Sequence, residues 1–295
     1  MAGPLFKQIT VIAPGLLGGS LAMACRERGL AATVMGVARR QETLDLGLRR
    51  GAFDHVTRDL PEGVRGAELV VIGAPVRASI SILQSIVPHI PKACIVTDVG
   101  STKQAIMDAA LEVLPPGRFV GGHPMAGSHE SGMEAADPAL FVGARYLLTE
   151  DGQTPRCTLD RVEALVRALG AEPLWMDARD HDRLTARISH LPHVAACALV
   201  ECAANFELSG VDALALASTG FRDTTRVAAG HPTMWTDICL TNRAGLLEAL
   251  DAYQSALALL RTRISEAEEA EIKDWLESAA AVRRGMGQPN DRETE

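Results

Sequence analysis

From Gln8 to about Asp177, short apolar runs of strand-forming residues alternate with amphipathic stretches long enough to form helices. Parallel neighbouring strands need a crossover of about a dozen residues or more, so this alternation is typical of βαβ units that feed a parallel sheet. The strands that the pattern predicts cover residues 9–13, 33–38, 69–74, 94–99, 119–121, 146–149 and 174–176. We therefore expect the chain to begin with an α/β domain whose sheet is doubly wound and mostly parallel.

After Asp177 the pattern changes, because strand-like runs give way to Ala- and Leu-rich helical stretches that continue to about Ala281. We expect the α/β domain over residues 1–177, an all-helical C-terminal domain over 178–283 and a flexible polar tail over 284–295. In the last long helical stretch, apolar residues recur at alternating steps of four and three: Leu246, Leu250, Tyr253, Leu257, Leu260, Ile264 and Ala267. Such a seam suits packing against another helix, either inside a bundle of this chain or across a homodimer.

The composition excludes several classes of partner and compartment. The formal net charge of -8 at pH 7 gives no long-range attraction for nucleic acid or an acidic membrane surface. None of the six cysteines belongs to a C-x-x-C pair, so neither a disulfide framework nor a zinc knuckle is expected. The sequence has no export signal and no apolar run near the roughly 18 residues of a membrane-spanning helix. We expect a cytoplasmic protein that binds neither nucleic acid nor a membrane.

A glycine-rich turn follows the first predicted strand and opens the first helix. Its sequence is Ala13-Pro14-Gly15-Leu16-Leu17-Gly18. Gly15 and Gly18 occupy the second and third positions of the dinucleotide-binding fingerprint G-x-G-x-x-G, while Ala13 replaces its first glycine. Backbone amides at a helix N-terminus stabilise a pyrophosphate, so we expect the four residues from Gly15 to Gly18 to bind a dinucleotide in a Rossmann-type domain. The alternative is a glycine-rich turn that binds nothing.

The end of the second predicted strand indicates which nicotinamide cofactor is preferred. NAD-binding folds place an acid there to hold the ribose 2′-hydroxyl, whereas a 2′-phosphate needs that carboxylate absent and a cation nearby. Here Arg39 and Arg40 follow the strand, and no acid is present. A guanidinium binds a phosphate through two hydrogen bonds, so NADP is favoured over NAD. The alternative is that both arginines only open a solvated helix.

Two further segments follow predicted strands at the edge where open α/β sheets bind ligands. They are Asp98-Val99-Gly100-Ser101-Thr102-Lys103 and Gly121-Gly122-His123-Pro124-Met125-Ala126-Gly127-Ser128. Five residues at this edge are expected to contact the cofactor: Ala74, Pro75, Asp98, Val99 and Gly100. A histidine at the same edge can accept a proton from a hydroxyl while hydride leaves the same carbon, because its pKa lies near working pH.

A lone histidine is more often a hydrogen-bonded structural residue, but His123 belongs to a longer pattern. The pattern continues as Ser189-His190-Leu191-Pro192-His193, Gly220-Phe221-Arg222-Asp223-Thr224-Thr225-Arg226 and Pro232-Thr233-Met234-Trp235. With these five segments in order, the chain resembles the prephenate/arogenate (cyclohexadienyl) dehydrogenase family over nearly its whole length.

The resemblance implies an NAD(P)-dependent oxidoreductase of tyrosine biosynthesis, which oxidises and decarboxylates prephenate, arogenate or both. It implies that His123 accepts the proton of the substrate hydroxyl, and that Ser101 orients His123, the hydroxyl and the nicotinamide. Arg226 would clamp a substrate carboxylate, since a planar guanidinium meets a carboxylate with two hydrogen bonds. The other implied substrate-binding residues are His193, His190, Asp223, Trp235 and His129. A homodimer through the helical domain is also implied.

The sequence leaves the choice between prephenate and arogenate open, because His129 stands where some relatives carry an acid, with Glu130 next to it. No metal is expected, since His190 and His193 share one helical face but lack a third ligand. We expect no further domain after the helical part, and we therefore expect inhibition by tyrosine, if it occurs, to be competitive.

Two other functions stay open. A non-catalytic NADP(H)-binding regulatory protein would suit the altered turn at Ala13 and Pro14. Another two-domain hydroxyacid dehydrogenase would use a helical lysine in its second half, where this chain has only Lys273.

Overall fold

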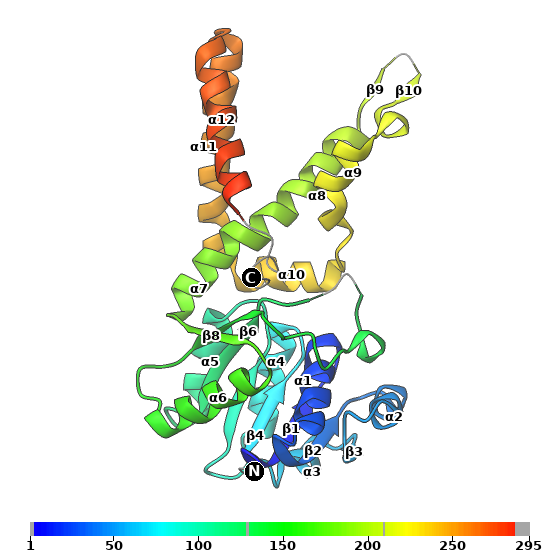
Figure 1. Ribbon diagram of the computed structural model, residues 1–295, viewed down its shortest axis with the longest axis vertical. Coiled ribbons are helices and arrows are strands. Elements are labelled where there is room, and N and C mark those ends of the chain that lie inside the picture. The colour runs from blue at the N-terminus through cyan, green and yellow to red at the C-terminus, as the bar shows by residue number, and fades with distance from the viewer. Residues whose placement is uncertain (1–2, 128–129, 209, 287–295) are drawn as a thin grey trace, which may run out of the picture.

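The computed structural model describes residues 3–127, 130–208 and 210–286, and Figure 1 shows an α/β body with two helical arms above it. Eight strands form one sheet in the order β3-β2-β1-β4-β5-β6-β7-β8. In chain order they are β1 (Phe6–Ile12), β2 (Ala31–Val37), β3 (His55–Thr57), β4 (Leu69–Ile72), β5 (Ile95–Asp98), β6 (Phe119–Pro124), β7 (Arg145–Thr149) and β8 (Glu172–Trp175). All neighbouring pairs are parallel except β6 with β7. The strand order reverses at β1, and doubly wound sheets bind ligands at such a point.

Helices cover both faces of this sheet. They are α1 (Leu16–Glu27), α2 (Gln41–Arg49), α3 (Leu60–Val64), α4 (Val76–Ile86), α5 (Gln104–Val113) and α6 (Arg156–Ala168). Buried side chains of α1 and α6 belong to one hydrophobic cluster, and those of α3, α4 and α5 belong to a second. Strand β4 contributes alternate residues to the two clusters, Val71 to the first and Ile72 to the second. A strand buried on both faces needs the continuous apolar run that the sequence has here.

The predicted doubly wound, mostly parallel sheet is confirmed, and all seven predicted strands are present with shifted ends. Strand β3 was missed. It has only three residues, and its side chains are half-buried or exposed, so it leaves no apolar run in the sequence.

The chain leaves the sheet through one long helical rod. It consists of α7 (Ala178–Thr185), a π-helical turn (Ala186–His190) and α8 (Leu191–Ala204). Pro192 is the second residue after the π-helical turn and has no N–H to donate to the preceding turn. A wider turn is one way in which a helix accommodates a proline, and such turns are frequent at functional sites.

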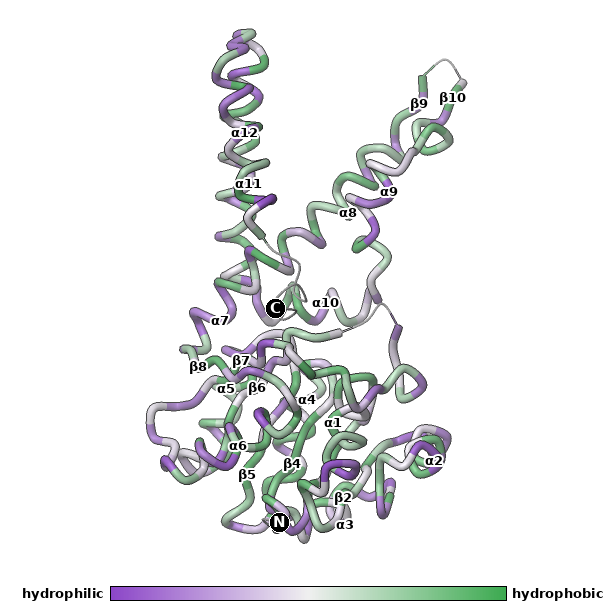
Figure 2. Tube along the Cα trace, viewed as in Figure 1, coloured by the Kyte–Doolittle hydropathy of each residue, from purple (hydrophilic) through white to green (hydrophobic). Residues whose placement is uncertain are grey.

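The helical part forms two arms, and the α8 end of the rod belongs to one of them. Figure 1 shows α8 beside α9 (Thr219–Thr225) in one arm, and α11 (Arg243–Ser265) beside α12 (Glu269–Gly285) in the other. Helix α10 (Pro232–Thr241) lies between the arms and the body, where it contacts α4. Figure 2 shows hydrophobic segments along both arms as well as in the sheet.

The predicted helical second domain is confirmed, with one short exception. Two-residue strands β9 (Glu207–Leu208) and β10 (Val211–Asp212) pair antiparallel at the tip of the α8 arm. Gly210 beside this pair has a φ of 79°, a conformation that glycine adopts without steric cost. Strands this short carry no alternating pattern that a sequence could reveal.

Helix α12 continues to Gly285, two residues into the segment predicted as a tail, and residues 287–295 of that segment lie outside the described part of the chain. Among the residues that the structure describes, no helix combines the length and the apolar character that crossing a membrane requires.

Candidate active site

The glycine-rich turn joins β1 to α1 and leaves backbone amides open. Ala13 has a φ of 55°, so it adopts the left-handed conformation that usually requires the glycine it replaces. This conformation costs an alanine about 1 kcal/mol. Gly15 precedes α1 without a side-chain cap, and a Cβ placed on Gly15 would meet no atom within 4 Å. The first N–H groups of α1 have no acceptor within the helix, so a pyrophosphate at this turn would accept their hydrogen bonds.

The third fingerprint glycine is required by close packing. A Cβ on Gly18 would lie 3.2 Å from Val11 Cγ1, and one on Gly73 would lie 2.8 Å from the Ala13 carbonyl oxygen. The turns after β1 and β4 therefore touch through their backbones, and this contact places Ala74 and Pro75 beside the nucleotide turn.

A pocket of about 430 Å³ opens beside this turn. Its lining includes Arg39, Ala74 and Pro75, all expected at the cofactor, together with Ala13, and contains no acidic residue. Arg58 also lines the pocket, and its Nε donates a hydrogen bond of 3.0 Å to the Arg39 carbonyl oxygen. The residues present therefore fit the adenosine end of a dinucleotide. Sequence reasoning missed Arg58 because it follows the missed strand β3.

Arg40 does not belong to that lining. It is exposed at the N-terminal boundary of α2, where the alternative interpretation placed it.

Asp98, at the end of β5, differs from the predicted cofactor contact. Its side chain is fully buried, and its oxygens accept hydrogen bonds from the amides of Gly100 (2.8 Å) and Gly122 (3.1 Å). Lys103 Nζ, also fully buried, forms an ion pair with the same carboxylate. Asp98 therefore joins the ends of β5 and β6 to the start of α5 and does not face a ligand. Val99 likewise packs into the hydrophobic core.

His123 lies near the end of β6, at the carboxyl edge of the sheet. Two glycines precede it because β6 passes close to its neighbours. A Cβ on Gly121 would lie 2.3 Å from Thr149 Oγ1, and one on Gly122 would lie 2.5 Å from the Asp98 carbonyl oxygen. This packing fixes the backbone that carries His123.

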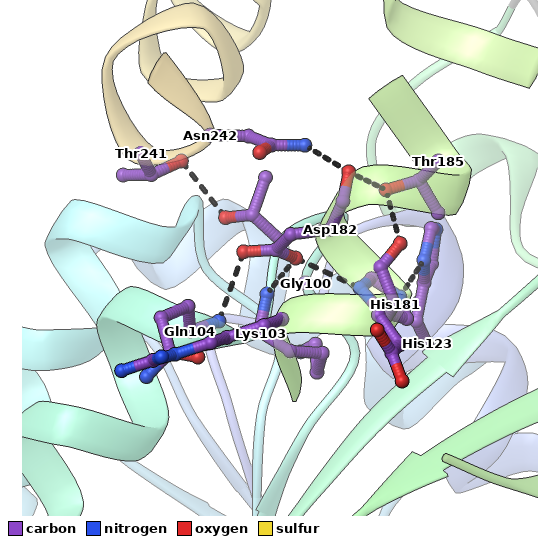
Figure 3. Close-up of polar contacts among 12 residues, drawn as sticks. Gly100, Lys103, Gln104, His123, His181, Asp182, Thr185, Thr241 and Asn242 are labelled. Carbon is purple, nitrogen blue, oxygen red and sulfur yellow. Dashed lines mark hydrogen bonds and ion pairs between the residues drawn. The ribbon is translucent and has the colours of Figure 1, made fainter. Parts of the chain in front are cut away.

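A chain of hydrogen bonds links His123 to the first helix after the sheet, as Figure 3 shows. His123 Nδ1 lies 2.9 Å from Nε2 of His181, and His181 Nδ1 lies 2.8 Å from Oδ1 of Asp182. His181 is fully buried. Sequence reasoning missed both residues, and the only available signal was an adjacent His-Asp pair just after the predicted domain boundary.

Asp182 also caps the start of α5. Its Oδ1 accepts from the Lys103 amide at 2.7 Å, and its Oδ2 accepts from the Gln104 amide at 3.0 Å. Asp182 thereby fastens α7 of the helical part to α5 of the sheet body.

The environment of His123 keeps its imidazole neutral. Burial lowers the pKa of His123 well below its usual value of 6.5, and electrostatic repulsion between a protonated His123 and the neighbouring His181, Lys103 and His190 side chains lowers this pKa further. A neutral imidazole can accept a proton from a substrate hydroxyl.

His190 and His193 lie together with Trp235, as predicted. The rings of His193 and Trp235 stack with centroids 3.5 Å apart, and His190 meets Trp235 edge-on at 6.2 Å. Gly230 is needed for this arrangement, since a Cβ there would lie 2.2 Å from Trp235 Nε1. Asn242 Nδ2 donates to His190 Nδ1 at 3.1 Å and to the Asp182 carbonyl oxygen at 2.6 Å. His190 therefore belongs to the same network as His123.

Two ring nitrogens in this group have no hydrogen-bond partner in the described part of the chain: His190 Nε2 and His193 Nδ1. Both atoms are buried, and a buried polar atom without a partner is costly. Such atoms are suited to bind a polar ligand.

The structure does not bring every predicted residue to this centre. Arg226 and Asp223 are exposed at the end of α9, in the arm. Ser101 is half-buried in the bend between β5 and α5, and within the described ranges no hydrogen bond joins it to His123. His129 lies outside the described residues. No group of three or more His, Cys, Asp or Glu side chains among the described residues could hold a metal ion.

The fold and the site together define a two-domain oxidoreductase that uses a nicotinamide dinucleotide. Residues 21–174 match the family model described as prephenate dehydrogenase, nucleotide-binding domain, and residues 177–278 match prephenate dehydrogenase, dimerization domain. The chain belongs to the prephenate dehydrogenase family.

Individual relatives agree with this assignment. The chain is 34% identical over 274 residues to the prephenate dehydrogenase of Bacillus subtilis (strain 168), which covers 92% of this chain and 74% of the relative. The structure of A. aeolicus prephenate dehydrogenase in complex with hydroxyphenyl propionate and NAD+ superposes with a TM-score of 0.91 at 28% identity, over 95% of this chain and 98% of that one. Synechocystis arogenate dehydrogenase superposes with a TM-score of 0.84 at 34% identity, over 95% of this chain and 100% of that one.

Proposed function

We propose that this chain catalyses the oxidative decarboxylation of prephenate, arogenate or both, giving 4-hydroxyphenylpyruvate or tyrosine. The observation that carries the proposal is the neutral, half-buried imidazole of His123 at the carboxyl edge of the sheet, near His190 of the helical part. Relatives named for prephenate and for arogenate support the same reaction class.

The reaction moves one proton, one hydride and one carboxylate. A dinucleotide held at the glycine-rich turn and in the pocket lined by Arg39 and Arg58 would supply the acceptor for the hydride of the ring carbon that carries the hydroxyl. His123 accepts the hydroxyl proton, so the oxygen can donate electrons to that carbon as the hydride leaves. The ring carboxylate leaves as CO2, its bonding electrons complete the aromatic ring, and the proton returns from His123 to the oxygen. Ser101, in the bend after β5, is assigned to orient the hydroxyl.

Substrate recognition is assigned to the helical part. The unpartnered nitrogens of His190 and His193 offer hydrogen bonds to the substrate's polar groups, and Trp235 holds His193 in place by stacking. Arg226 is assigned to a carboxylate, because its exposed guanidinium can form two parallel hydrogen bonds with one. Asp223 and His129 are assigned to the border of this site on the family resemblance alone.

NADP is proposed as the preferred cofactor, since Arg39 and Arg58 line the pocket beside β2 and no acid does. A 2′-phosphate there gains two cations, whereas a ribose 2′-hydroxyl finds no carboxylate to accept its hydrogen bond. The relative from A. aeolicus is named as a complex with NAD+, so the two cofactors must be compared directly.

A homodimer through the helical part is proposed from the surface of the arms. Leu257, Leu259 and Ile264 of α11 expose between 45% and 59% of their surface, and Phe206 and Leu216 of the other arm expose more than half. Exposed apolar residues clustered in this way mark an interface. The match to a dimerization domain covers the same residues.

Initial rates with prephenate or arogenate, each with NAD or NADP, test the proposal. We expect reduced nicotinamide to form with at least one substrate, and faster with NADP. No reduction in any of the four combinations would overturn the proposed activity and favour the non-catalytic alternative. Faster reduction of NAD would overturn the cofactor preference alone.

A further inference from the structure

We propose that His181 and Asp182 are positioning residues which hold His123 in the tautomer with a proton on Nδ1 and a free acceptor at Nε2. The proposal rests on the proposed function of His123 as proton acceptor. It adds a contribution from the helical part to the orientation of a group on the sheet.

The ionised carboxylate of Asp182 only accepts hydrogen bonds. Its Oδ1 receives the Lys103 amide proton and lies 2.8 Å from His181 Nδ1. A short contact between an ionised carboxylate and a ring nitrogen requires a proton on that nitrogen. His181 Nδ1 therefore carries a hydrogen.

The neutral form of His181 determines the direction of its hydrogen bond with His123. Burial lowers the pKa of His181, although its hydrogen bond to Asp182 opposes this shift. A neutral imidazole with a proton on Nδ1 has an unprotonated Nε2, which accepts hydrogen bonds. His181 Nε2 lies 2.9 Å from His123 Nδ1, so His123 Nδ1 must donate.

The position of this proton determines which nitrogen of His123 can react. Neutral His123 with its proton on Nδ1 has a lone pair on Nε2, the nitrogen that points away from His181. When Nε2 accepts the substrate's proton, His123 becomes an imidazolium whose Nδ1–H still donates to His181. The positive charge is then stabilised through His181 by the Asp182 carboxylate. No further reactant is needed, and the proton leaves by the same nitrogen.

The relay also ties the chemistry to the docking of the two parts. His123 belongs to β6, whereas His181 and Asp182 belong to α7. Asp182 is fixed to the amides that open α5, and its own carbonyl oxygen accepts from Asn242 at the start of α11. Movement of α7 relative to the sheet would therefore remove the acceptor for His123 Nδ1.

Nitrogen-15 NMR of the full-length protein with labelled histidine tests the tautomer directly. The sequence has eight histidines, and the His123 signals are assigned by their loss in His123→Asn. We expect an Nδ1 shift typical of a protonated nitrogen and an Nε2 shift typical of an unprotonated one. The opposite pattern would overturn the proposal. This readout needs no turnover, so it stands apart from any failure of the proposed activity.

Kinetics of two variants test the positioning role. His181→Leu removes the acceptor, and we expect kcat to fall by about 100-fold or more with substrate KM changed by less than about threefold, since a wrong tautomer in a comparable triad costs about 10⁴-fold. His181→Gln returns an acceptor oxygen near the position of Nε2. We expect the kcat of this variant to be at least about tenfold higher than that of His181→Leu.

His89→Leu is the matched control, because His89 is exposed and lies just after α4, at the opposite edge of the sheet. Thermal unfolding and cofactor binding verify that each variant is folded. A His181→Leu enzyme as active as the control would overturn the proposal. Equal losses in the Leu and Gln variants would overturn it too, since they would point to packing alone.

Discussion

The sheet body and the helical arms of this chain differ in how they are stabilised. The body has two large clusters of buried apolar side chains, one on each face of the sheet. After Asp177, in contrast, the described chain buries only six hydrophobic residues, and four are alanines: Ala178, Ala186, Ala196, Ile238, Leu246 and Ala249. The body is held by its own core, whereas the arms leave their leucines exposed and need another surface to cover them.

The polar contacts show the reverse pattern. The charged and imidazole groups gather where the two parts meet, with buried Lys103 and half-buried His123 from the body and buried His181, Asp182 and His190 from the rod. Polar groups buried at a junction fix one geometry, because any shift leaves a donor or acceptor unpaired. The comparison suggests that the body provides a rigid frame, the junction provides the chemistry and the arms provide substrate contacts and assembly.

Removal of the central imidazole should have the largest effect. His123→Ala is expected to lower kcat by about 10³-fold with little change in substrate KM, because general base catalysis contributes about 10²–10⁴-fold. Steady-state kinetics measure both values. A change confined to KM would mean that His123 binds the substrate and does not act on the proton.

A substitution in the arm should give the opposite kinetic pattern. Arg226→Ala is expected to raise substrate KM by about 30-fold with kcat within a fewfold, since lost charge-assisted hydrogen bonds cost about 2 kcal/mol. Arg222→Ala is the neighbouring control, as Arg222 is also an exposed arginine of α9. Equal effects of the two substitutions would remove Arg226 from the site.

A charged residue placed on the exposed surface of the arm tests whether that surface forms the proposed interface. Leu257→Glu is expected to weaken self-association by at least about tenfold, because the proposed interface would bury an unpaired carboxylate. Leu111→Glu is the matched control, since Leu111 is 50% exposed on α5 of the body and Leu257 is 45% exposed on α11. Sedimentation velocity over a concentration series measures the association. A monomeric wild-type protein would contradict the statement that the arms need another surface to cover their exposed leucines.

Cofactor preference belongs to the body alone. Arg39→Ala is expected to raise the KM for NADP by about tenfold and to change the KM for NAD by less than about twofold, because only NADP carries the 2′-phosphate. Arg40→Ala, outside the pocket lining, should change neither value by more than about twofold. Equal effects of Arg39→Ala on both cofactors would contradict the assignment.

The smallest effect is expected from mild acid. The pKa of His123 is held well below 6.5 by burial, so the neutral form dominates down to that pH. Activity that depends on the neutral base should therefore change by less than about twofold between pH 8 and 6.5, and should fall only below that range. A profile of kcat/KM against pH measures it, and a decline that begins above pH 7 would contradict a neutral, buried base.

Much of this architecture followed from the sequence because its signals are local. The apolar run of β4 is continuous, β1 and β5 are rich in Ile and Val, and the change at Asp177 marks the end of the alternation. His190, His193 and Trp235 were grouped by a family pattern, and the structure brings them together.

Other features depend on three-dimensional packing and left little signal. Strand β3 is defined by its pairing with β2 and not by its own three residues, and Arg58 enters the nucleotide pocket only because that strand exists. Asp98 appeared to face a ligand, but the buried Lys103 turns its carboxylate inward. His181 contacts His123, about 60 positions earlier in the chain, and local sequence spacing does not predict contacts over such a separation.

We propose that hydride transfer is coupled to decarboxylation at His123. It is tested most directly by the ratio of CO2 to reduced nicotinamide, measured with a cyclohexadienyl substrate whose ring carboxylate carries carbon-13. We expect one labelled CO2 for each reduced nicotinamide in the wild-type enzyme, and loss of both products together in His123→Ala. Reduced nicotinamide without labelled CO2 would contradict it.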